Sequence, residues 1–133
     1  KYMALPQTLQ RKDALENFLR MEKWVADSPD QAGDTYRQFI KDMYQENKLI
    51  QDRFELAGRP VRLKHIQMPI LTIYAKSDHI VPPATTIPIH SAVRSKDKEL
   101  LEFPGGHIGV FVGSRSQKIL TPAISKWLID RDA

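Results

Sequence analysis

In the first 50 residues of the chain, apolar positions recur among polar ones with the period of a helix. Between positions 9 and 27, LQRKDALENFLRMEKWVAD, apolar residues recur every three or four positions. They are Leu15, Phe18, Leu19, Met21 and Val25. This spacing predicts an amphipathic helix with one apolar face.

A second helix is predicted at positions 27–48, DSPDQAGDTYRQFIKDMYQENK. Ser28 can cap its start, Pro29 suits the first helical position, and Gln31 completes a capping box. The apolar positions then form one stripe, made of Tyr36, Phe39, Ile40, Met43 and Tyr44. A stripe at this spacing is typical of core packing. The alternative is a face that contacts substrate or a partner.

The period is lost in RFELAGRPVRL, positions 53–63, where apolar and polar residues alternate on both sides of Gly58 and Pro60. Alternation around such residues predicts a short hairpin, or two extended pieces joined by a turn. This stretch is therefore a junction between two kinds of structure.

From Met68 onward the pattern is that of strands. MPILTIYAKSD holds a run of β-branched and aromatic residues, which predicts a strand covered on both faces. TTIPIHSAVRS predicts a short helix that starts near Thr85 or Thr86, with Pro88 tolerated in its first turn. KELLEF, positions 98–103, predicts a second strand.

The last helix is expected in PAISKWLIDRD, opening at Pro122, with Ile124, Trp127 and Leu128 on its buried face. The order strand, helix, strand, helix is typical of an α/β protein with a parallel sheet and a right-handed crossover. Two parallel strands alone leave both lateral edges unpaired. We therefore expect the second half to be the end of a larger sheet, and the chain to be incomplete.

Composition narrows the possible functions. Of 133 residues, 41% are hydrophobic and 27% charged, which is typical of a folded domain. The 20 basic and 16 acidic residues are interspersed and form no basic stripe, which argues against nucleic-acid binding. No apolar run approaches the roughly 20 residues that span a membrane. The chain has no cysteine, which excludes disulfides, thiolate metal sites and a cysteine nucleophile within it.

Candidate chemistry lies where the two predicted strands end. The first strand runs into Asp78, and the second runs through FPGG into His107, 29 positions later. The carboxyl ends of neighbouring parallel strands share one rim of the sheet. A carboxylate there can fix the imidazole tautomer and leave the other ring nitrogen as a base. The alternatives are a turn aspartate before two prolines and a solvated turn histidine.

The remaining histidines fit this arrangement less well. His79 is expected to be a hydrogen-bonding or packing neighbour, and His65 and His90 to be surface or structural residues. No two histidines have the spacing of a zinc site. The GGHIG segment lacks the lysine and the helix start of a phosphate-binding loop. We therefore expect neither a metal nor a bound cofactor.

Three stretches closely resemble the C-terminal part of polyhydroxyalkanoate (poly-3-hydroxybutyrate) synthases. They are DSPDQAGDTYRQFIKDMYQENKL, MPILTIYAKSDHIVPP and LEFPGGHIGVFVG. The resemblance is nearest to the short-chain-length synthases that work with a second subunit. It implies the C-terminal portion of an α/β-hydrolase fold at positions 61–133, preceded by a helical cap segment at 1–60.

The resemblance also implies a function. Such enzymes are acyltransferases at the surface of cytoplasmic polyester granules, and they join (R)-3-hydroxyacyl groups from coenzyme A thioesters into a growing polyester. His107 matches the histidine that activates a cysteine thiol. Asp78 matches the aspartate that either orients this histidine or helps to deprotonate the incoming hydroxyl. The cap segment matches one linked to dimer contacts and access control. Exposed strand edges and apolar stripes also lead us to expect self-association.

One part of the family pattern is missing. The nucleophile motif G-x-C-x-G is absent, so the chain holds two of three catalytic residues and is expected to be inactive alone. Two alternatives stay open. One is part of an esterase or lipase whose serine nucleophile also lies upstream. The other is a non-catalytic module that docks a partner subunit or a granule surface.

Overall fold

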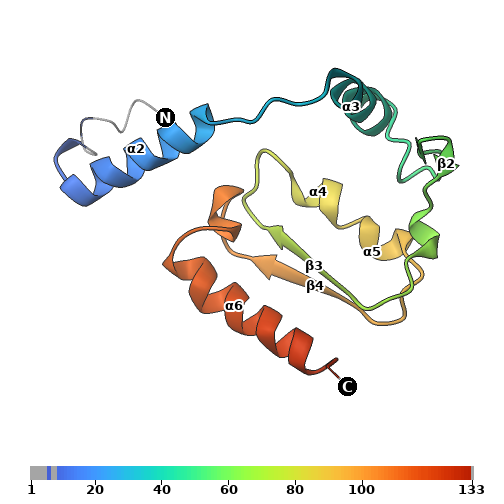
Figure 1. Ribbon diagram of the computed structural model, residues 1–133. Helices are drawn as coiled ribbons and strands as arrows, with labels where there is room; N and C mark the ends of the chain where they lie inside the picture. Colours follow the sequence, from blue (N-terminus) through green and yellow to red (C-terminus); the bar gives the residue numbers. More distant parts are fainter. Residues whose placement is uncertain (1–5, 7–8, 133) are drawn as a thin grey trace. The chain divides into compact units, whose positions relative to one another are not determined.

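The computed structural model describes residue 6 and residues 9–132 (Figure 1). The chain divides into two compact units, Lys1–Phe39 and Ile40–Ala133. The first contains α2 (Lys12–Ala26) and α3 (Gly33–Gln38), and the second contains both small sheets and the helices after position 60. The assignment of 1–60 as a cap and 61–133 as a core stays a prediction.

The first predicted helix is confirmed as α2. Asp13 in its first turn and Lys23 in its last turn both complement the helix dipole. Leu15, Phe18 and Met21 are partly buried, while Val25 is exposed. The apolar side of α2 is therefore only half covered.

The predicted capping box at the second helix is wrong. Helix α3 begins at Gly33 behind Ala32, without a side-chain cap. The hydroxyl of Ser28 instead donates to the carbonyl of Val25, 3.3 Å away, at the end of the preceding helix. Ser28 therefore bonds to the end of α2 instead of capping the start of α3. Serine and threonine hydroxyls readily make such local backbone bonds.

After α3 the chain continues as a π-helix, η2 (Phe39–Gln45). A π-helix bonds i to i+5, so positions spaced for an α-helix no longer share one face. The expected core packing of the stripe is wrong for its aromatic members, because Tyr36, Phe39 and Tyr44 are 55%, 43% and 69% exposed. Its other two members, Ile40 and Met43, are partly buried.

The predicted hairpin is confirmed. Strands β1 (Glu55–Leu56) and β2 (Arg59–Pro60) pair antiparallel. The two residues between them, Ala57 and Gly58, have φ of +49° and +72°. Such left-handed angles at both central positions are what a tight two-residue turn requires, and they explain the glycine.

Both predicted strands and their parallel pairing are confirmed. Strands β3 (Ile70–Ala75) and β4 (Lys98–Phe103) are hydrogen-bonded in register over six residues. Their ends meet α6 in a small core of Ala75, Phe103 and Leu120. Among the described residues, no further strand pairs with either outer edge of this sheet.

The connection between the strands holds two short helices instead of one. Helix α4 (Pro83–Thr86) and helix α5 (Ile89–Ala92) are separated at Pro88, which occupies the N-cap of α5. Proline has no N–H for a continuous helix and clashes with the preceding turn, which accounts for the break. The two helices lie on one side of the sheet and α6 on the other (Figure 1).

The predicted start of the last helix is wrong. Helix α6 spans Ser114–Ile129 and contains Pro122 in its interior. Its buried face is made by Ser116 and Leu120, with Ile124 packed against the core. Packing on both sides of the proline outweighs its local cost, about 3 kcal/mol in an isolated helix. Leu128, expected to be buried, is 55% exposed.

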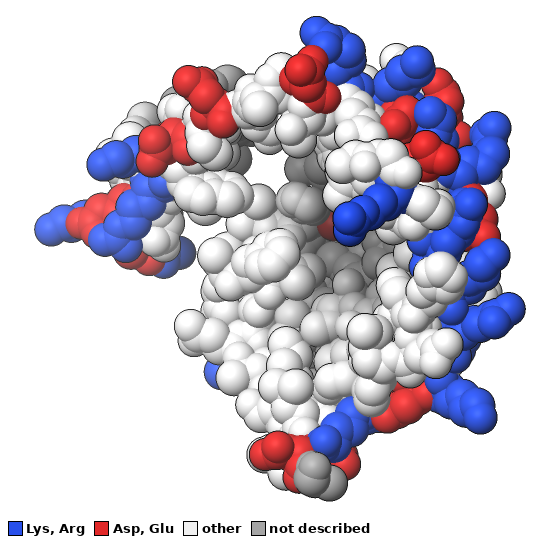
Figure 2. Space-filling model, turned by 45° about the vertical axis from the view of Figure 1, so that its right-hand side comes forward, with Lys and Arg blue, Asp and Glu red and all other residues white. Residues whose placement is uncertain are grey.

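Charged side chains of both signs lie close to one another along the molecular surface. Figure 2 shows acidic groups among the basic ones along one margin, next to a wide uncharged area. This agrees with the interspersed charges of the sequence. Within residues 6 and 9–132, no helix has both the length and the apolarity to cross a membrane.

Candidate active site

The two strand ends bring Asp78 and His107 together, as the sequence predicts. Ala75 and Phe103 end the strands as register partners. Beyond them, the N–H of Lys76 donates to the carbonyl of Phe103 at 2.9 Å, and the N–H of Ser77 donates to that of Gly105 at 2.9 Å.

These bonds join the two loops before either reaches its functional residue. The Nδ1 atom of His107 lies 2.9 Å from Oδ2 of Asp78. The histidine side chain is 33% exposed, whereas that of Asp78 is 8% exposed. The pair is therefore anchored on the aspartate side and accessible on the histidine side.

The carboxylate of Asp78 is fixed by its own loop. Its Oδ1 accepts the N–H groups of Ile80 at 2.9 Å and Val81 at 2.8 Å. Burial alone raises the pKa of Asp78, but the bonds from Val81, His107 and Ile80 outweigh it and hold the pKa below 3.8. Asp78 is consequently ionised at neutral pH, and both of its oxygens are engaged.

The His107 loop rests on the ring of Phe103, which is 1% exposed. A Cβ built on Gly105 falls 2.4 Å from Cε1 of that ring, and one on Gly109 falls 3.4 Å from it. Gly105 is therefore required for close approach. This gives a physical reason for one of the two glycines before the histidine.

The first turn of α6 holds the His107 loop on both sides. Arg115 donates from Nη1 to the carbonyl of Pro104 at 3.0 Å. The buried hydroxyl of Ser116 donates to the carbonyl of Val110 at 2.5 Å. Neither residue is predicted from the sequence, because the helix-start signal at Pro122 lies beyond both of them. No motif distinguishes Ser116 from the other serines of the chain.

The other histidines lie away from this pair. His65 and His79 are exposed, and His90 is partly buried. Among the described residues, His79 follows Asp78 but makes no hydrogen bond to it or to His107. In the described part of the chain, no three histidine, aspartate or glutamate side chains are grouped as metal ligands.

This geometry suits proton transfer. With Asp78 ionised, Nδ1–H of His107 donates to it, which fixes the tautomer and leaves Nε2 to accept a proton. Nε2 has no hydrogen-bond partner within residues 9–132. The carboxylate also stabilises the imidazolium that forms. The nucleophile that such a base activates is not a cysteine of this chain, because the chain has none.

The chain matches a known protein family over nearly its whole length. The family model described as PHB de-polymerase C-terminus matches residues 8–132, and the chain belongs to this family. The chain is also 50% identical over 131 residues to the poly(3-hydroxyalkanoate) polymerase subunit PhaC of Allochromatium vinosum. The same subunit is 47% identical in Thiocystis violacea and 47% identical in a Synechocystis species. The predicted resemblance to polyhydroxyalkanoate synthases is thereby confirmed.

The alignments cover nearly all of this chain but only part of each relative. They include 98% of the chain in all three cases. They include 37%, 37% and 35% of the relatives, in the same order. The chain thus spans about a third of the length of the polymerase subunits that it matches.

Proposed function

We propose that this chain is the C-terminal part of a polyhydroxyalkanoate polymerase with an α/β-hydrolase fold, that His107 is its catalytic base, and that Asp78 is the catalytic carboxylate paired with it. The observation that carries the proposal is the 2.9 Å contact between His107 Nδ1 and Asp78 Oδ2 at adjoining ends of two parallel strands. The identity to polymerase subunits supports the reaction class.

The proposed reaction needs a cysteine thiol from the part of the protein outside this chain. Nε2 of His107 takes the thiol proton, and the thiolate attacks the carbonyl carbon of an (R)-3-hydroxyacyl-coenzyme A thioester. The C–S bond to coenzyme A breaks, and the departing thiolate recovers the proton from His107. The acyl group is left on the cysteine as a new thioester.

The polymer grows when the 3-hydroxyl of one unit attacks the acyl thioester of another. The hydroxyl oxygen forms an ester bond, its proton passes to the base, and the cysteine thiolate is released. Asp78 either orients His107 during this step or helps to remove the hydroxyl proton. None of these steps calls for a metal or a redox cofactor.

The partners, the assembly and the location of the enzyme belong to the same proposal. We expect a second synthase subunit, self-association, and a cytoplasmic location at polyester granules. No described residue outside β3 and β4 forms a strand on the outer edges of their sheet, which fits a chain that completes its sheet with further strands of the same protein. Without them and without a nucleophile, this chain alone is expected to be inactive.

The name of the matching family favours a second candidate, hydrolysis of the polyester. The Asp78–His107 pair could equally serve a serine nucleophile and pass the acyl group to water. The residue at the nucleophile position of the complete protein separates the two. Cysteine favours polymerisation, and serine favours hydrolysis.

The decisive test uses the complete protein that contains this chain. Release of coenzyme A from (R)-3-hydroxybutyryl-coenzyme A is compared for the parent, His107→Ala and the matched control His79→Ala. We expect His107→Ala to lower kcat by about 10²–10⁴-fold, and His79→Ala to retain activity. Equal activity in parent and His107→Ala contradicts the proposal. Release that needs only water and yields free acid moves the assignment to the hydrolase.

A further inference from the structure

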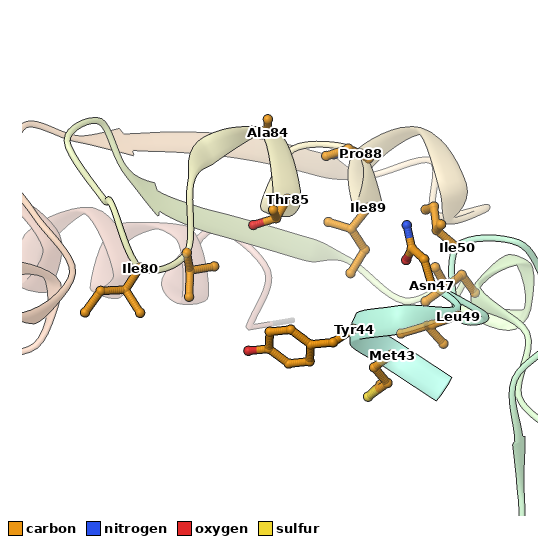
Figure 3. Close-up of a pocket in the computed structure, with 12 residues that line it drawn as sticks. Met43, Tyr44, Asn47, Leu49, Ile50, Ile80, Ala84, Thr85, Pro88 and Ile89 are labelled. Atoms are coloured by element: carbon orange, nitrogen blue, oxygen red, sulfur yellow. The ribbon is translucent and has the colours of Figure 1, made fainter. Parts of the chain in front are cut away.

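A pocket adjoins the Asp78 loop within the unit Ile40–Ala133. Its volume is about 480 Å³, within the range of small-molecule sites. One wall comes from positions 43–50 and the other from positions 80–89. Figure 3 shows Ile80, Thr85 and Ile89 on one side, facing Tyr44 and Met43 on the other.

The lining of the pocket selects for an uncharged ligand. Nine of its twelve lining residues are apolar and none is charged; the polar ones are Tyr44, Asn47 and Thr85. The hydroxyl of Thr85 already donates to the carbonyl of Pro82 at 2.7 Å, so it can only accept from a ligand. The amide of Asn47 can donate to a carbonyl. A phosphate or a nucleotide finds no cation here.

The pocket adjoins the loop that holds the candidate catalytic carboxylate. Its wall residues Ile80 and Val81 are the two residues whose N–H groups bind Oδ1 of Asp78. The other oxygen of the same carboxylate contacts His107. A ligand in the pocket therefore lies against the loop that fixes the carboxylate.

Two side chains of the pocket wall also expose apolar surface that a ligand could cover. Ile80 is 72% exposed and Val81 is 40% exposed, although both adjoin a buried carboxylate. Covering such surface is favourable because it removes apolar area from water. An aliphatic group of a few carbon atoms, joined to a carbonyl, matches both the apolar walls and the Asn47 amide.

We propose that this pocket binds the acyl unit, with its alkyl side group, of the ester or thioester on which the Asp78–His107 pair acts. The size of the pocket then selects the length of the acyl chain. This rests on the proposed function. The acyl unit can come from the incoming monomer or from the growing polyester, and the two sources share this chemistry.

The first test narrows the pocket of the complete protein. Ile89 lines the pocket and its side chain points toward Tyr44 (Figure 3), so Ile89→Phe narrows the pocket. Ile129→Phe, at an exposed position at the end of α6, is the matched control. Substrates are the 4-, 6- and 8-carbon (R)-3-hydroxyacyl-coenzyme A thioesters. We expect Ile89→Phe to lower the kcat/KM ratio of the longest to the shortest substrate by about tenfold. The control should leave it unchanged.

A second variant shows whether a changed substrate ratio comes from the pocket or only from damage to the fold. Ile89→Ala enlarges the pocket and should raise the same ratio. Equal losses for all chain lengths, or an unchanged ratio in both variants, overturns the proposal. An effect on the first release of coenzyme A identifies the monomer as the occupant. An effect confined to elongation from an added 3-hydroxybutyrate oligomer identifies the polyester.

A binding measurement separates this proposal from the proposed function. The binding of methyl (R)-3-hydroxyoctanoate is measured by isothermal titration calorimetry in the parent, His107→Ala and Ile89→Phe proteins. We expect His107→Ala to bind like the parent and Ile89→Phe to bind at least about tenfold more weakly. Binding without any polymerase activity supports the pocket and refutes the proposed function. If Ile89→Phe binds as well as the parent, the ligand does not occupy this pocket and the proposal fails.

Discussion

The ring of Phe103 occupies the space that a side chain on residue 105 would need. A Cβ at Gly105 would lie 2.4 Å from Cε1 of Phe103, and Phe103 is 1% exposed. The ring cannot move away without disturbing Ala75 and Leu120, with which it forms the core. The position of the His107 loop is thus set directly by core packing.

We predict that Gly105→Ala destabilises the protein and reduces activity. Overpacking of this kind costs about 1–3 kcal/mol, and any shift of the loop displaces His107. Urea unfolding and coenzyme A release measure the two effects. Gly106→Ala is the control, because a Cβ there meets only the Ser77 carbonyl at an ordinary 3.5 Å. Equal losses in both variants contradict the close-approach explanation.

The elements that could be predicted from the sequence are those whose signal is local. β-branched runs predicted β3 and β4, and the alternation around Gly58 predicted the hairpin. The meeting of Asp78 with His107 followed from one topological rule, that parallel strands end at the same rim.

The wrong predictions arose where local signals compete with packing. Ser28 and Pro29 have the sequence of a helix start, yet the hydroxyl of Ser28 bonds the helix before it. Pro122 has the sequence of a helix start, yet the buried Leu120 before it and the partly buried Ile124 after it pack on the core and keep α6 continuous. The π-helix η2 has no sequence signature, so the exposure of Tyr44 could not be anticipated.

A second prediction concerns the hydroxyl of Ser116. It is 7% exposed, and it donates to the Val110 carbonyl, which follows the His107 loop. Ser116→Ala leaves that carbonyl without its partner and should cost about 1–2 kcal/mol of unfolding free energy. Ser125→Ala, at an exposed position of the same helix, should change stability by less than about 0.5 kcal/mol.

Activity distinguishes a positioning role of Ser116 from a merely structural one. If the hydroxyl positions the loop, Ser116→Ala lowers kcat more than it raises KM, even well below the temperature at which it unfolds. Full kcat in a destabilised variant assigns Ser116 to stability alone.

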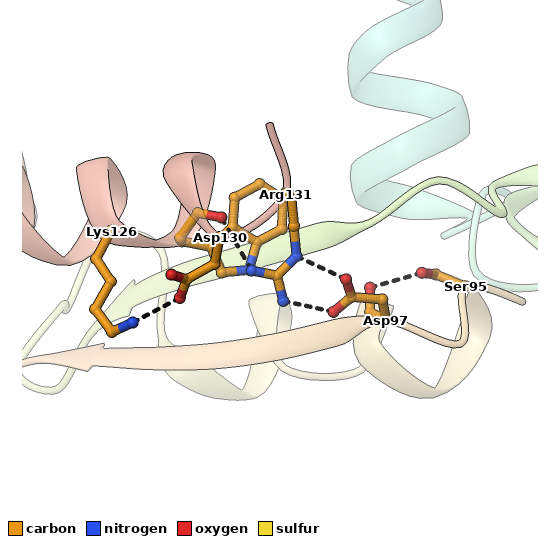
Figure 4. Close-up of polar contacts among 6 residues, drawn as sticks. Ser95, Asp97, Lys126, Asp130 and Arg131 are labelled. Carbon is orange, nitrogen blue, oxygen red and sulfur yellow. Dashed lines mark hydrogen bonds and ion pairs between the residues drawn. The ribbon is translucent and has the colours of Figure 1, made fainter. Parts of the chain in front are cut away.

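The far end of α6 is tied to the start of β4 by Arg131. Its Nε and Nη2 atoms donate to the two carboxylate oxygens of Asp97, each at 2.6 Å. The guanidinium also stacks over the ring of Trp127, 4.2 Å from its centroid. Figure 4 shows this fork, with the hydroxyl of Ser95 donating to the Asp97 carbonyl at 2.7 Å. A planar fork of this kind requires arginine.

A third prediction follows for the pH dependence of stability. The hydrogen bond from Arg131, more than the opposing effect of burial, holds the pKa of Asp97 below 3.8. A carboxyl whose pKa is lower in the folded state stabilises the protein above its unfolded pKa and loses this effect as pH falls through the folded value. Asp97→Asn should therefore lower Tm near neutral pH, and its difference from the parent should shrink below about pH 3.8. A difference independent of pH, measured by scanning calorimetry of the complete protein, contradicts this.

The last prediction separates a catalytic role of Asp78 from a purely structural role in its turn. Asp78→Asn keeps a carbonyl oxygen for the N–H groups of Ile80 and Val81, so the fold should keep its Tm within a few degrees. Its amide cannot hold the Nδ1–H tautomer of His107, so kcat should fall by about 10²–10⁴-fold. Asp78→Ala removes the acceptor as well and should lower both kcat and Tm. If Asp78→Asn instead melts like Asp78→Ala, or retains the parental kcat, Asp78 is a turn residue and the acid–base assignment of the pair is wrong.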